Sequence, residues 1–303
     1  MTAGAEERTV PRRAVATRRR LRPGRIALHA FLIVTSLVWL FPILWALYTS
    51  FRPYSETAQL GYVSVAQSLT LDNYVHAWDQ AKIPMRFFNT MVIVIPALVI
   101  VLLLASAIGF ALSRFSFRFN VFLLMLFTAG NLLPPQVIIT PLFRMYLALP
   151  LPAPLSDNGV WYDQYLGIIA IQVAFQLGFA TFVLSNYMKA LPKELTEAAL
   201  VDGASVLRTF WQVILPLSRP PLAALASLQF TWMYNDFFWA LVLMRTGDKR
   251  PVTTGLNDLQ GLFFSDNNLL AAGAMIIALP TLIVFLMFQR QFVRGLTLGT
   301  TKG

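Results

Sequence analysis

The sequence predicts an all-α membrane protein in which six transmembrane helices make up most of the chain. Hydrophobic residues account for 57% of the 303 residues and charged residues for only 13%, whereas soluble domains are roughly 45–50% apolar. The hydrophobic residues are gathered in runs of about 20 or more, the length that a helix needs to cross the hydrocarbon core. None of these runs alternates as the strands of a membrane barrel do, so we expect helices to satisfy the backbone hydrogen bonds in lipid.

The apolar runs define six spans, at residues 26–49, 87–113, 121–143, 164–188, 221–244 and 269–289. With both termini in the cytoplasm, most of the 24 Lys and Arg residues fall on the inner side, where cationic flanks stay. This topology gives a cytoplasmic tail at residues 1–25, which we expect to be disordered, a membrane domain at residues 26–292, and a cytoplasmic tail at residues 293–303. It predicts a multi-pass protein of the cytoplasmic membrane, and we expect from the Ala- and Arg-rich composition that this membrane is bacterial.

The N-terminal tail carries much of the positive charge. Eight arginines precede the first span: Arg8, Arg12, Arg13, Arg18, Arg19, Arg20, Arg22 and Arg25. We interpret this cluster first as a topology signal, second as a contact with anionic membrane lipid, and only last as an RNA-binding tail, so no nucleic-acid partner is expected. The first span is too long for a cleaved signal peptide, and no small-x-small cleavage site follows it.

Sequence patterns for catalysis and for metal binding are absent. There is no cysteine, no G-x-x-x-x-G-K-[ST] phosphate-binding loop and no H-E-x-x-H pair. His29 and His76 are the only histidines, too few for a metal site, and no nucleophile lies beside a base. We therefore expect a chain that is not an enzyme and binds no metal or cofactor.

The stretch TEAALVDGASVLRTFWQVILPLSRP lies in the inner connection between the fourth and fifth spans. It predicts a two-helix element, which we call the 192–216 segment. Pro192 is suited to the first turn of a helix, and the acidic residues that follow lie near the positive end of the helix dipole. The helix repeat places Leu195, Ala198, Ala199 and Asp202 on one face.

The middle of this segment predicts a sharp change of direction. Gly203 can adopt the left-handed conformation that ends a helix, and Ser205 can cap the next helix. Pro216 then blocks continuation of that second helix. We expect a rigid element that exposes acidic and small residues, although an ordinary amphipathic connector is the alternative interpretation.

This pattern resembles the cytoplasmic signature of binding-protein-dependent ABC importer permeases. That signature is E-A-A-x-x-x-G, nine residues, a β-branched residue, one further residue and Leu-Pro. The matching positions are Glu197, Ala198, Ala199, Gly203, Val213, Leu215 and Pro216. TEAALVDGA is similar to the version found in carbohydrate importers. NLLPPQVIITPLF and the C-terminal AAGAMIIALPTLIVFLMFQRQFVRGLTLGTTKG resemble the smaller six-span permease of maltose-type sugar importers.

The resemblance implies a coupling role for the segment. Its first helix would be the coupling helix that docks on a separate ATPase subunit, with Glu197 as the acidic contact and with Asp202 and Gly203 shaping the turn. Residues 295–303 would also contact the ATPase dimer, which carries the ATP and Mg. The implied partners are a second permease subunit, that ATPase dimer and an extracellular solute-binding lipoprotein, and the implied mechanism is alternating access.

Polar and aromatic residues within the predicted spans are candidates for the translocation path. Asp236 is the one acidic residue inside a span and should face the bundle interior; Asn235, Trp232 and Trp239 lie near it. An interhelical or subunit contact is the alternative that we favour for Asp236. Asn131 and Gln136 are likewise candidates either for the translocation path or for an interhelical contact. They flank a double proline that predicts a helix break.

Three positions depart from the family pattern. Tyr234 stands where the family usually has Trp before Asn-Asp, and Thr300 and Thr301 replace small apolar residues.

The last outer loop, residues 245–268, would by resemblance dock on the solute-binding protein, with a plain connector as the alternative. A self-contained secondary transporter remains a competing function, but it would need more charged residues in the spans. Which sugar is carried, or whether it is a polyol, is left open.

Overall fold

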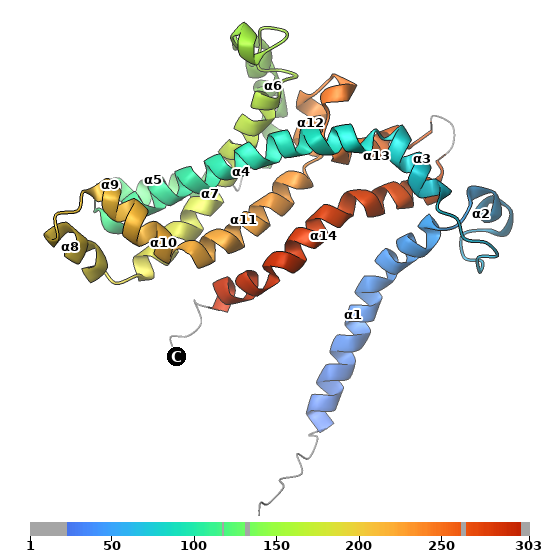
Figure 1. The fold of residues 1–303 in the computed structure, drawn as a ribbon, viewed down its shortest axis with the longest axis horizontal. Helices are drawn as coiled ribbons and strands as arrows, with labels where there is room; N and C mark the ends of the chain where they lie inside the picture. Colours follow the sequence, from blue (N-terminus) through green and yellow to red (C-terminus); the bar gives the residue numbers. More distant parts are fainter. Residues whose placement is uncertain (1–22, 117, 131–133, 262–264, 298–303) are drawn as a thin grey trace, which may run out of the picture. The chain divides into compact units, whose positions relative to one another are not determined.

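The computed structural model describes residues 23–116, 118–130, 134–261 and 265–297, and this part of the chain is helical, with two isolated β-bridges and no strand (Figure 1). The chain divides into two units, residues 1–45 and 46–303. The first unit holds most of α1, Pro23–Ser50, an apolar helix of 28 residues. At 1.5 Å per residue α1 is about 42 Å long, which is sufficient to cross a membrane.

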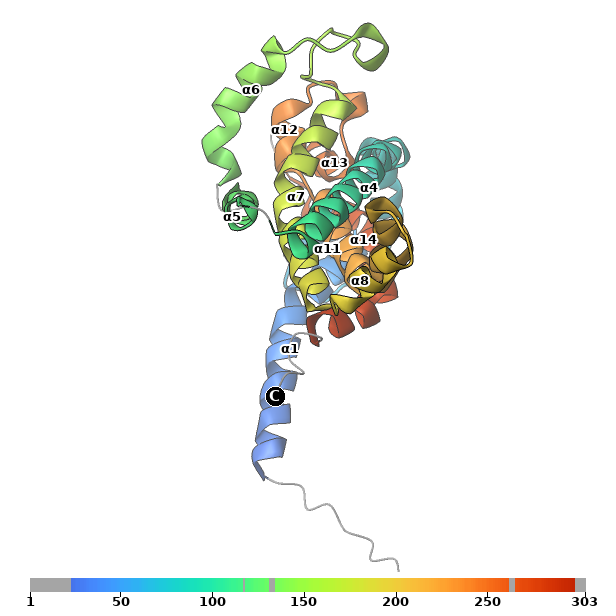
Figure 2. The ribbon, with the colours of Figure 1, turned by 90° about the vertical axis from the view of Figure 1, so that its left-hand side faces the viewer.

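Four long helices form the bundle of the second unit (Figures 1 and 2). They are α4 (Ile83–Arg114), α7 (Tyr165–Ala190), α11 (Arg219–Tyr234) and α14 (Asn267–Thr297). α4 packs along α7, and α11 contacts α4, α7 and α14. The buried apolar core lies between these helices.

Short elements lie at both ends of this bundle. The 192–216 segment contains α8 (Glu194–Val201), α9 (Val206–Thr209), the π-turn η3 (Phe210–Ile214) and the first two residues of α10 (Leu215–Leu217). We call the opposite end the far end. It carries α2 (Tyr54–Leu60), α3 (Asp72–Gln80), η2 (Ala153–Leu155), η4 (Gly247–Lys249), η5 (Val252–Thr254) and α13 (Gly255–Asp258).

Four of the predicted spans are continuous helices. α1, α4, α7 and α14 are long and apolar enough to cross a membrane, and their bounds differ by a few residues from the predicted ones. A fifth span is obtained if α5 (Asn120–Gly130) is joined to η1 (Pro135–Ile138) and α6 (Ile139–Ala148), which form a bent pair. The break before Pro135 confirms the interruption that the double proline predicts.

The span predicted at residues 221–244 is not one continuous helix. α11 ends at Tyr234, and α12 begins only at Phe238 and ends at Leu243. The local cause is that the Trp239 N–H donates to a side chain instead of to a backbone carbonyl of a continuing helix: the Asp236 carboxylate accepts from it at 3.3 Å. A polar side chain that competes for backbone N–H groups in this way favours the end of one helix and the start of the next.

Small residues allow α4 and α7 to approach closely. Ala97, Val101 and Ala105 on α4 and Ala180 and Leu184 on α7 are fully buried. A Cβ atom added to Gly109 would lie 3.1 Å from the Ser185 nitrogen and 3.3 Å from the Leu184 Cβ. The packing of small side chains is what brings membrane helices together when lipid offers no hydrophobic driving force.

A buried arginine joins three elements at the far end. Arg52, with no exposed surface, bonds to the Glu56 carboxylate at 2.8 Å and to the Tyr62 carbonyl at 3.1 Å. The Arg52 carbonyl accepts from the amides of Asn73 at 2.8 Å and Asn268 at 2.7 Å, which belong to α3 and α14. The hydrogen bond from Arg52 lowers the pKa of Glu56 to about 2.

The α4–α7 packing predicts a specific effect of Gly109→Leu. The added side chain has no room against Leu184 and Ser185, so we expect a loss of about 1–3 kcal/mol of stability, as for other overpacked sites. Thermal unfolding of the purified protein in detergent measures this loss. Gly130→Leu is the control, because a Cβ atom there meets nothing within 4 Å; equal destabilisation by both changes would contradict the close packing.

The lowered pKa of Glu56 predicts a pH dependence. A carboxylate whose pKa falls from 4.5 when free to about 2 when folded stabilises the fold fully above pH 4.5 and loses this effect as the pH falls towards 2. The difference in melting temperature between the wild type and Glu56→Gln should therefore be constant from pH 7 to about 5 and narrow below that. A difference independent of pH down to 2.5 would show that the ionised carboxylate is not its source.

Candidate functional site

The first helix of the 192–216 segment ends in a Schellman turn. α8 runs from Glu194 to Val201, and Gly203 follows with a φ of +80°. The Gly203 N–H donates to the Leu200 carbonyl at 3.0 Å, and the Ala204 N–H donates to the Ala199 carbonyl at 2.9 Å. These two bonds define the motif and confirm the predicted conformation of Gly203. A Cβ at Gly203 would meet no atom within 4 Å, so the requirement for glycine is conformational.

The second helix begins at the predicted cap and ends close to the predicted proline. The Ser205 Oγ accepts a hydrogen bond from the Arg208 N–H at 3.2 Å. The helix then widens into the π-turn Phe210–Ile214, and α10 ends at Leu217, one residue beyond Pro216. A π-turn is a common irregularity at functional sites, and here it directly precedes a proline ring that clashes in a regular helix. The sequence does not reveal the π-turn.

Pro192 lies outside the first helix, contrary to the sequence prediction. α8 begins at Glu194, and its first-turn acidic residues are Glu194 and Glu197. The Lys193 carbonyl accepts from the N–H groups of Thr196 and Glu197, so the helical hydrogen bonds start one residue after the proline.

The segment is fixed to the end of α4. The Phe210 ring lies 5.3 Å from the Phe110 ring of α4, and both Phe210 and Ile214 are buried. The Arg114 guanidinium, in the last turn of α4, donates to the Leu191 carbonyl at 3.1 Å. Because aromatic contacts and buried apolar surface hold the two elements together, we expect a displacement of the segment to displace α4 as well.

The opposite face of the segment is open. Glu197, Ala198 and Asp202 are exposed, and neither of the two carboxylates forms an ion pair within the described residues. Apolar side chains accompany them, with Val201 86% and Leu207 67% exposed. Of the other predicted coupling residues, Ala199 is half-buried behind this face, whereas Leu215 and Pro216 lie in α10, away from it.

Asp236 lies in the break between α11 and α12. Its carboxylate accepts from the Trp239 N–H at 3.3 Å. Its carbonyl accepts from the Thr253 hydroxyl at 2.7 Å. The residue thus links α12 and η5; the interhelical contact favoured for it and a transport role both stay predictions.

The other candidate path residues are not brought together into one site. The Trp239 ring is buried 5.2 Å from Phe175, whereas Trp232 is 44% exposed and packs edge-on to Phe179. The Asn235 amide donates back to the Thr231 carbonyl of its own helix. Gln136 is exposed in η1. Asn131, residues 1–22 and residues 298–303 lie outside the described residues.

The last loop, at residues 245–261, is fastened to the far end of α4. The Asn89 amide donates to the Asp248 carbonyl at 2.7 Å and to the Arg250 carbonyl at 3.1 Å. The Val252 N–H donates to the Thr90 hydroxyl at 2.9 Å. Arg86, 3% exposed, forms an ion pair with Asp258 of α13. The loop is therefore an ordered part of the fold, which the sequence did not indicate.

Asp163 joins this loop to the proline-rich connection between α6 and α7. It has a φ of +63°, unusual for a residue other than glycine. Its carboxylate accepts from the N–H groups of Arg245 and Thr246 and from the Thr246 hydroxyl. Partial burial raises the pKa of Asp163, but the hydrogen bonds from Thr246 and Arg245 outweigh this and the net pKa lies below its usual value.

Within the described part of the chain, no group of three or more His, Cys, Asp or Glu residues is arranged to hold a metal ion. The geometry instead defines a helical membrane protein with a protruding, glycine-terminated element at one end and an ordered loop at the other.

Comparison with known proteins identifies this class. Residues 105–297 match the family described as "Binding-protein-dependent transport system inner membrane component". The chain belongs to this family, which agrees with the prediction of a transport subunit rather than an enzyme.

Relatives of known name span nearly the whole chain. It is 33% identical over 285 residues to the osmoprotective compounds uptake permease protein GgtD of Synechocystis, covering 92% of each. It is 32% identical over 276 residues to the diacetylchitobiose uptake system permease protein NgcG of Streptomyces coelicolor, covering 90% of this chain and 88% of NgcG. Its fold is similar to that of a chain from the crystal structure of a bacterial ABC transporter involved in alginate import. The TM-score is 0.71 at 22% sequence identity, and the match covers 89% of this chain and 97% of the transporter chain.

The position of Asp236 predicts different effects for two substitutions. Asp236→Asn keeps an oxygen that can accept from the Trp239 N–H, so we expect stability close to that of the wild type. Asp236→Ala removes the acceptor and should cost about 0.5–2 kcal/mol, as the loss of a helix cap does. Thermal unfolding in detergent compares them, with Asn235→Ala as the neighbouring control. If Asp236→Asn and Asp236→Ala destabilise the protein equally, the hydrogen bond from the Trp239 N–H does not stabilise the break between α11 and α12.

Proposed function

We propose that this chain is one of two transmembrane subunits of an ATP-driven importer of sugars, with six spans and both termini in the cytoplasm. The observation that carries the proposal is the 192–216 segment, a rigid element fixed to α4 on one side and open on the other. The names of the relatives, which concern diacetylchitobiose, osmoprotective compounds and alginate, support a carbohydrate or related polar solute.

The segment would couple ATP hydrolysis to the spans. Its exposed residues, Glu197, Ala198 and Asp202, would contact a separate ATPase dimer that holds ATP and Mg. Movement of that dimer would reach α4 through Phe210 and Phe110, and would reach α11 through Ser218, which directly joins α10 to α11. Rigid elements moving about such joints produce alternating access.

The far end would face the exterior and receive a solute-binding lipoprotein. The ordered loop at residues 245–261 supports this assignment, because a fixed surface loses little conformational entropy on binding. A second permease subunit would supply the other half of the translocation path. Trp232, Asn235 and Asp236 remain the candidates on this chain for contact with the solute.

Gly203→Val tests the coupling role. A β-branched residue at a φ of +80° is strained by about 1–2 kcal/mol or more, so the angle between α8 and α9 should change while the membrane helices still insert. In vesicles containing the complete transporter, we expect ATP-dependent uptake to fall at least about tenfold, as for a change of ~1.4 kcal/mol, with the chain still present in the membrane.

Two controls make this test specific. Gly203→Asn should keep most of the uptake, since Asn tolerates the left-handed region. Gly159→Val introduces the same backbone strain at another position of positive φ, which lies outside the 192–216 segment. This variant should reduce uptake less than Gly203→Val does. Normal uptake by Gly203→Val, or uptake that persists without hydrolysable ATP and depends on an ion gradient, would overturn the proposal.

A further inference from the structure

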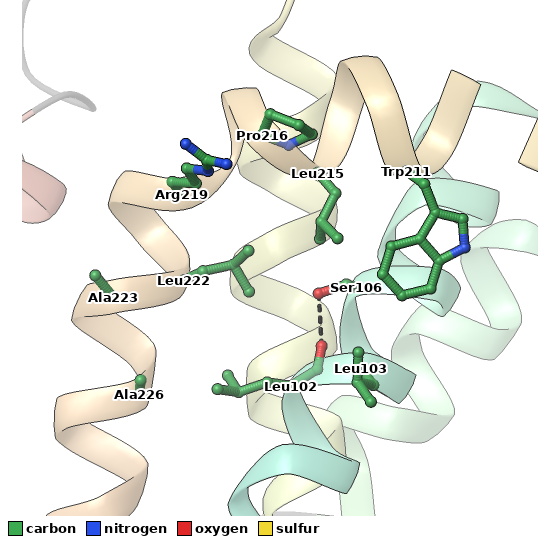
Figure 3. Close-up of a pocket in the computed structure, with 10 residues that line it drawn as sticks. All are labelled: Leu102, Leu103, Ser106, Trp211, Leu215, Pro216, Arg219, Leu222, Ala223 and Ala226. Atoms are coloured by element: carbon green, nitrogen blue, oxygen red, sulfur yellow. Dashed lines mark hydrogen bonds between the residues drawn. The ribbon is translucent and has the colours of Figure 1, made fainter. Parts of the chain in front are cut away.

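A pocket of about 440 Å³ opens between α4, α11 and the 192–216 segment (Figure 3). Leu102 and Ser106 of α4 form one wall, and Trp211 and Leu215 of the segment form another. Ala223 and Ala226 line the α11 side, where small side chains leave the space unfilled. The volume is within the range of roughly 300–1,000 Å³ that is typical of ligand sites.

The walls of this pocket are apolar. Ser106 is the one hydroxyl residue of the lining, and its Oγ donates to the Leu102 carbonyl of its own helix at 2.5 Å. It therefore has no proton to donate to a ligand. A sugar ring requires several polar partners to replace its hydration, so the pocket does not suit the transported solute.

One cation lies at the edge of the pocket. Figure 3 shows Arg219 and Trp211 on opposite sides of its upper edge, with Leu215 and Leu222 pointing between them. Arg219 is exposed, and within the described part of the chain its guanidinium has no hydrogen-bond or ion-pair partner. Trp211 is 49% exposed. Arginine and tryptophan beside an apolar groove are the residue types found where a helix end meets the head groups of a membrane.

We propose that this pocket holds an acyl chain of an anionic phospholipid and that Arg219 binds the phosphate of its head group. The proposal rests on the proposed function, which places the 192–216 segment at the cytoplasmic surface. The apolar walls match the acyl chain, and the guanidinium matches a phosphate in charge and in hydrogen-bonding geometry. Basic pockets between membrane helices on the cytoplasmic side bind anionic head groups in this way.

The position of the pocket gives the lipid a consequence for coupling. Its walls belong to three elements of the proposed coupling mechanism: α4 and the 192–216 segment, which move together, and α11, which follows the segment after Ser218 and can move relative to both. A bound acyl chain fills the space between them, so a change in their spacing must expel or reorder it. The inner-leaflet composition would thereby affect the movement of the segment.

Quenching of Trp211 fluorescence tests the proposal. The complete transporter is placed in lipid nanodiscs that contain either phosphatidylglycerol or phosphatidylcholine with brominated acyl chains. The Trp211 signal is the difference between the wild type and Trp211→Phe. We expect brominated phosphatidylglycerol to quench this signal at an about fivefold lower mole fraction than brominated phosphatidylcholine, the factor for one basic residue near an anionic surface.

Three variants separate the contributions. Arg219→Gln should abolish the preference while quenching by both lipids remains, and Ala223→Leu should reduce quenching by both because it fills the groove. Arg118→Gln, which removes an exposed arginine from the α4–α5 connection, should keep the preference.

Two results would overturn the proposal. Equal quenching by both lipids in the wild type would mean that the groove is ordinary lipid-facing surface. No quenching by either would mean that protein, such as the second subunit, covers it. The fluorescence readout needs no transport, and co-purification of the ATPase is followed separately, so failure of the lipid site and failure of the coupling role are distinguishable.

Discussion

The contacts of α4 at both its ends are the constraint on which the arrangement of this chain depends. At the far end, Asn89 and Thr90 hold the backbone of the last loop. At the other end, Phe110 packs on Phe210 of the 192–216 segment, and Arg114 binds Leu191 directly before it. The helix between them has 32 residues and is about 48 Å long at 1.5 Å per residue. A single rigid element therefore connects the loop that would meet the binding protein to the segment that would meet the ATPase.

The close contact of α4 with α7 makes this connection stiff. Because α7 approaches α4 so closely at Gly109 that even an added Cβ atom would lie 3.1 Å from the Ser185 nitrogen, we expect a tilt of α4 to move α7. The broken helices lie beside this pair. The chain breaks between α11 and α12, where the Asp236 carboxylate accepts a hydrogen bond from the Trp239 backbone N–H. Broken helices are tolerated at membrane depth only where other groups satisfy the freed backbone hydrogen-bonding groups. The rigid pair and the interrupted helices thus divide the bundle into a frame and parts that can rearrange.

The sequence predicted the features whose causes are local. Gly203 and Ser205 act within a few residues of themselves, so the turn and the cap could be predicted from their types and order, and the double proline likewise predicted the break before Pro135. The features that it missed depend on distant partners. The Arg52 carbonyl accepts from Asn73 and Asn268, which lie 21 and 216 positions later, and the Asp163 carboxylate accepts from residues 82 and 83 positions later. No spacing in the sequence reveals such pairs.

The distribution of ion pairs separates the two ends of the molecule. At the far end, Lys82 pairs with Asp248, Arg86 with Asp258 and Lys249 with Asp157, so the chain itself satisfies these charges and fixes the loop. On the 192–216 segment, Glu197 and Asp202 have no ion-pair partner among the described residues, in a chain with 24 Lys and Arg against 14 Asp and Glu. Exposed acidic residues left unpaired where cations are abundant, on a segment whose shape is already fixed by Gly203, suit a basic surface that belongs to another chain.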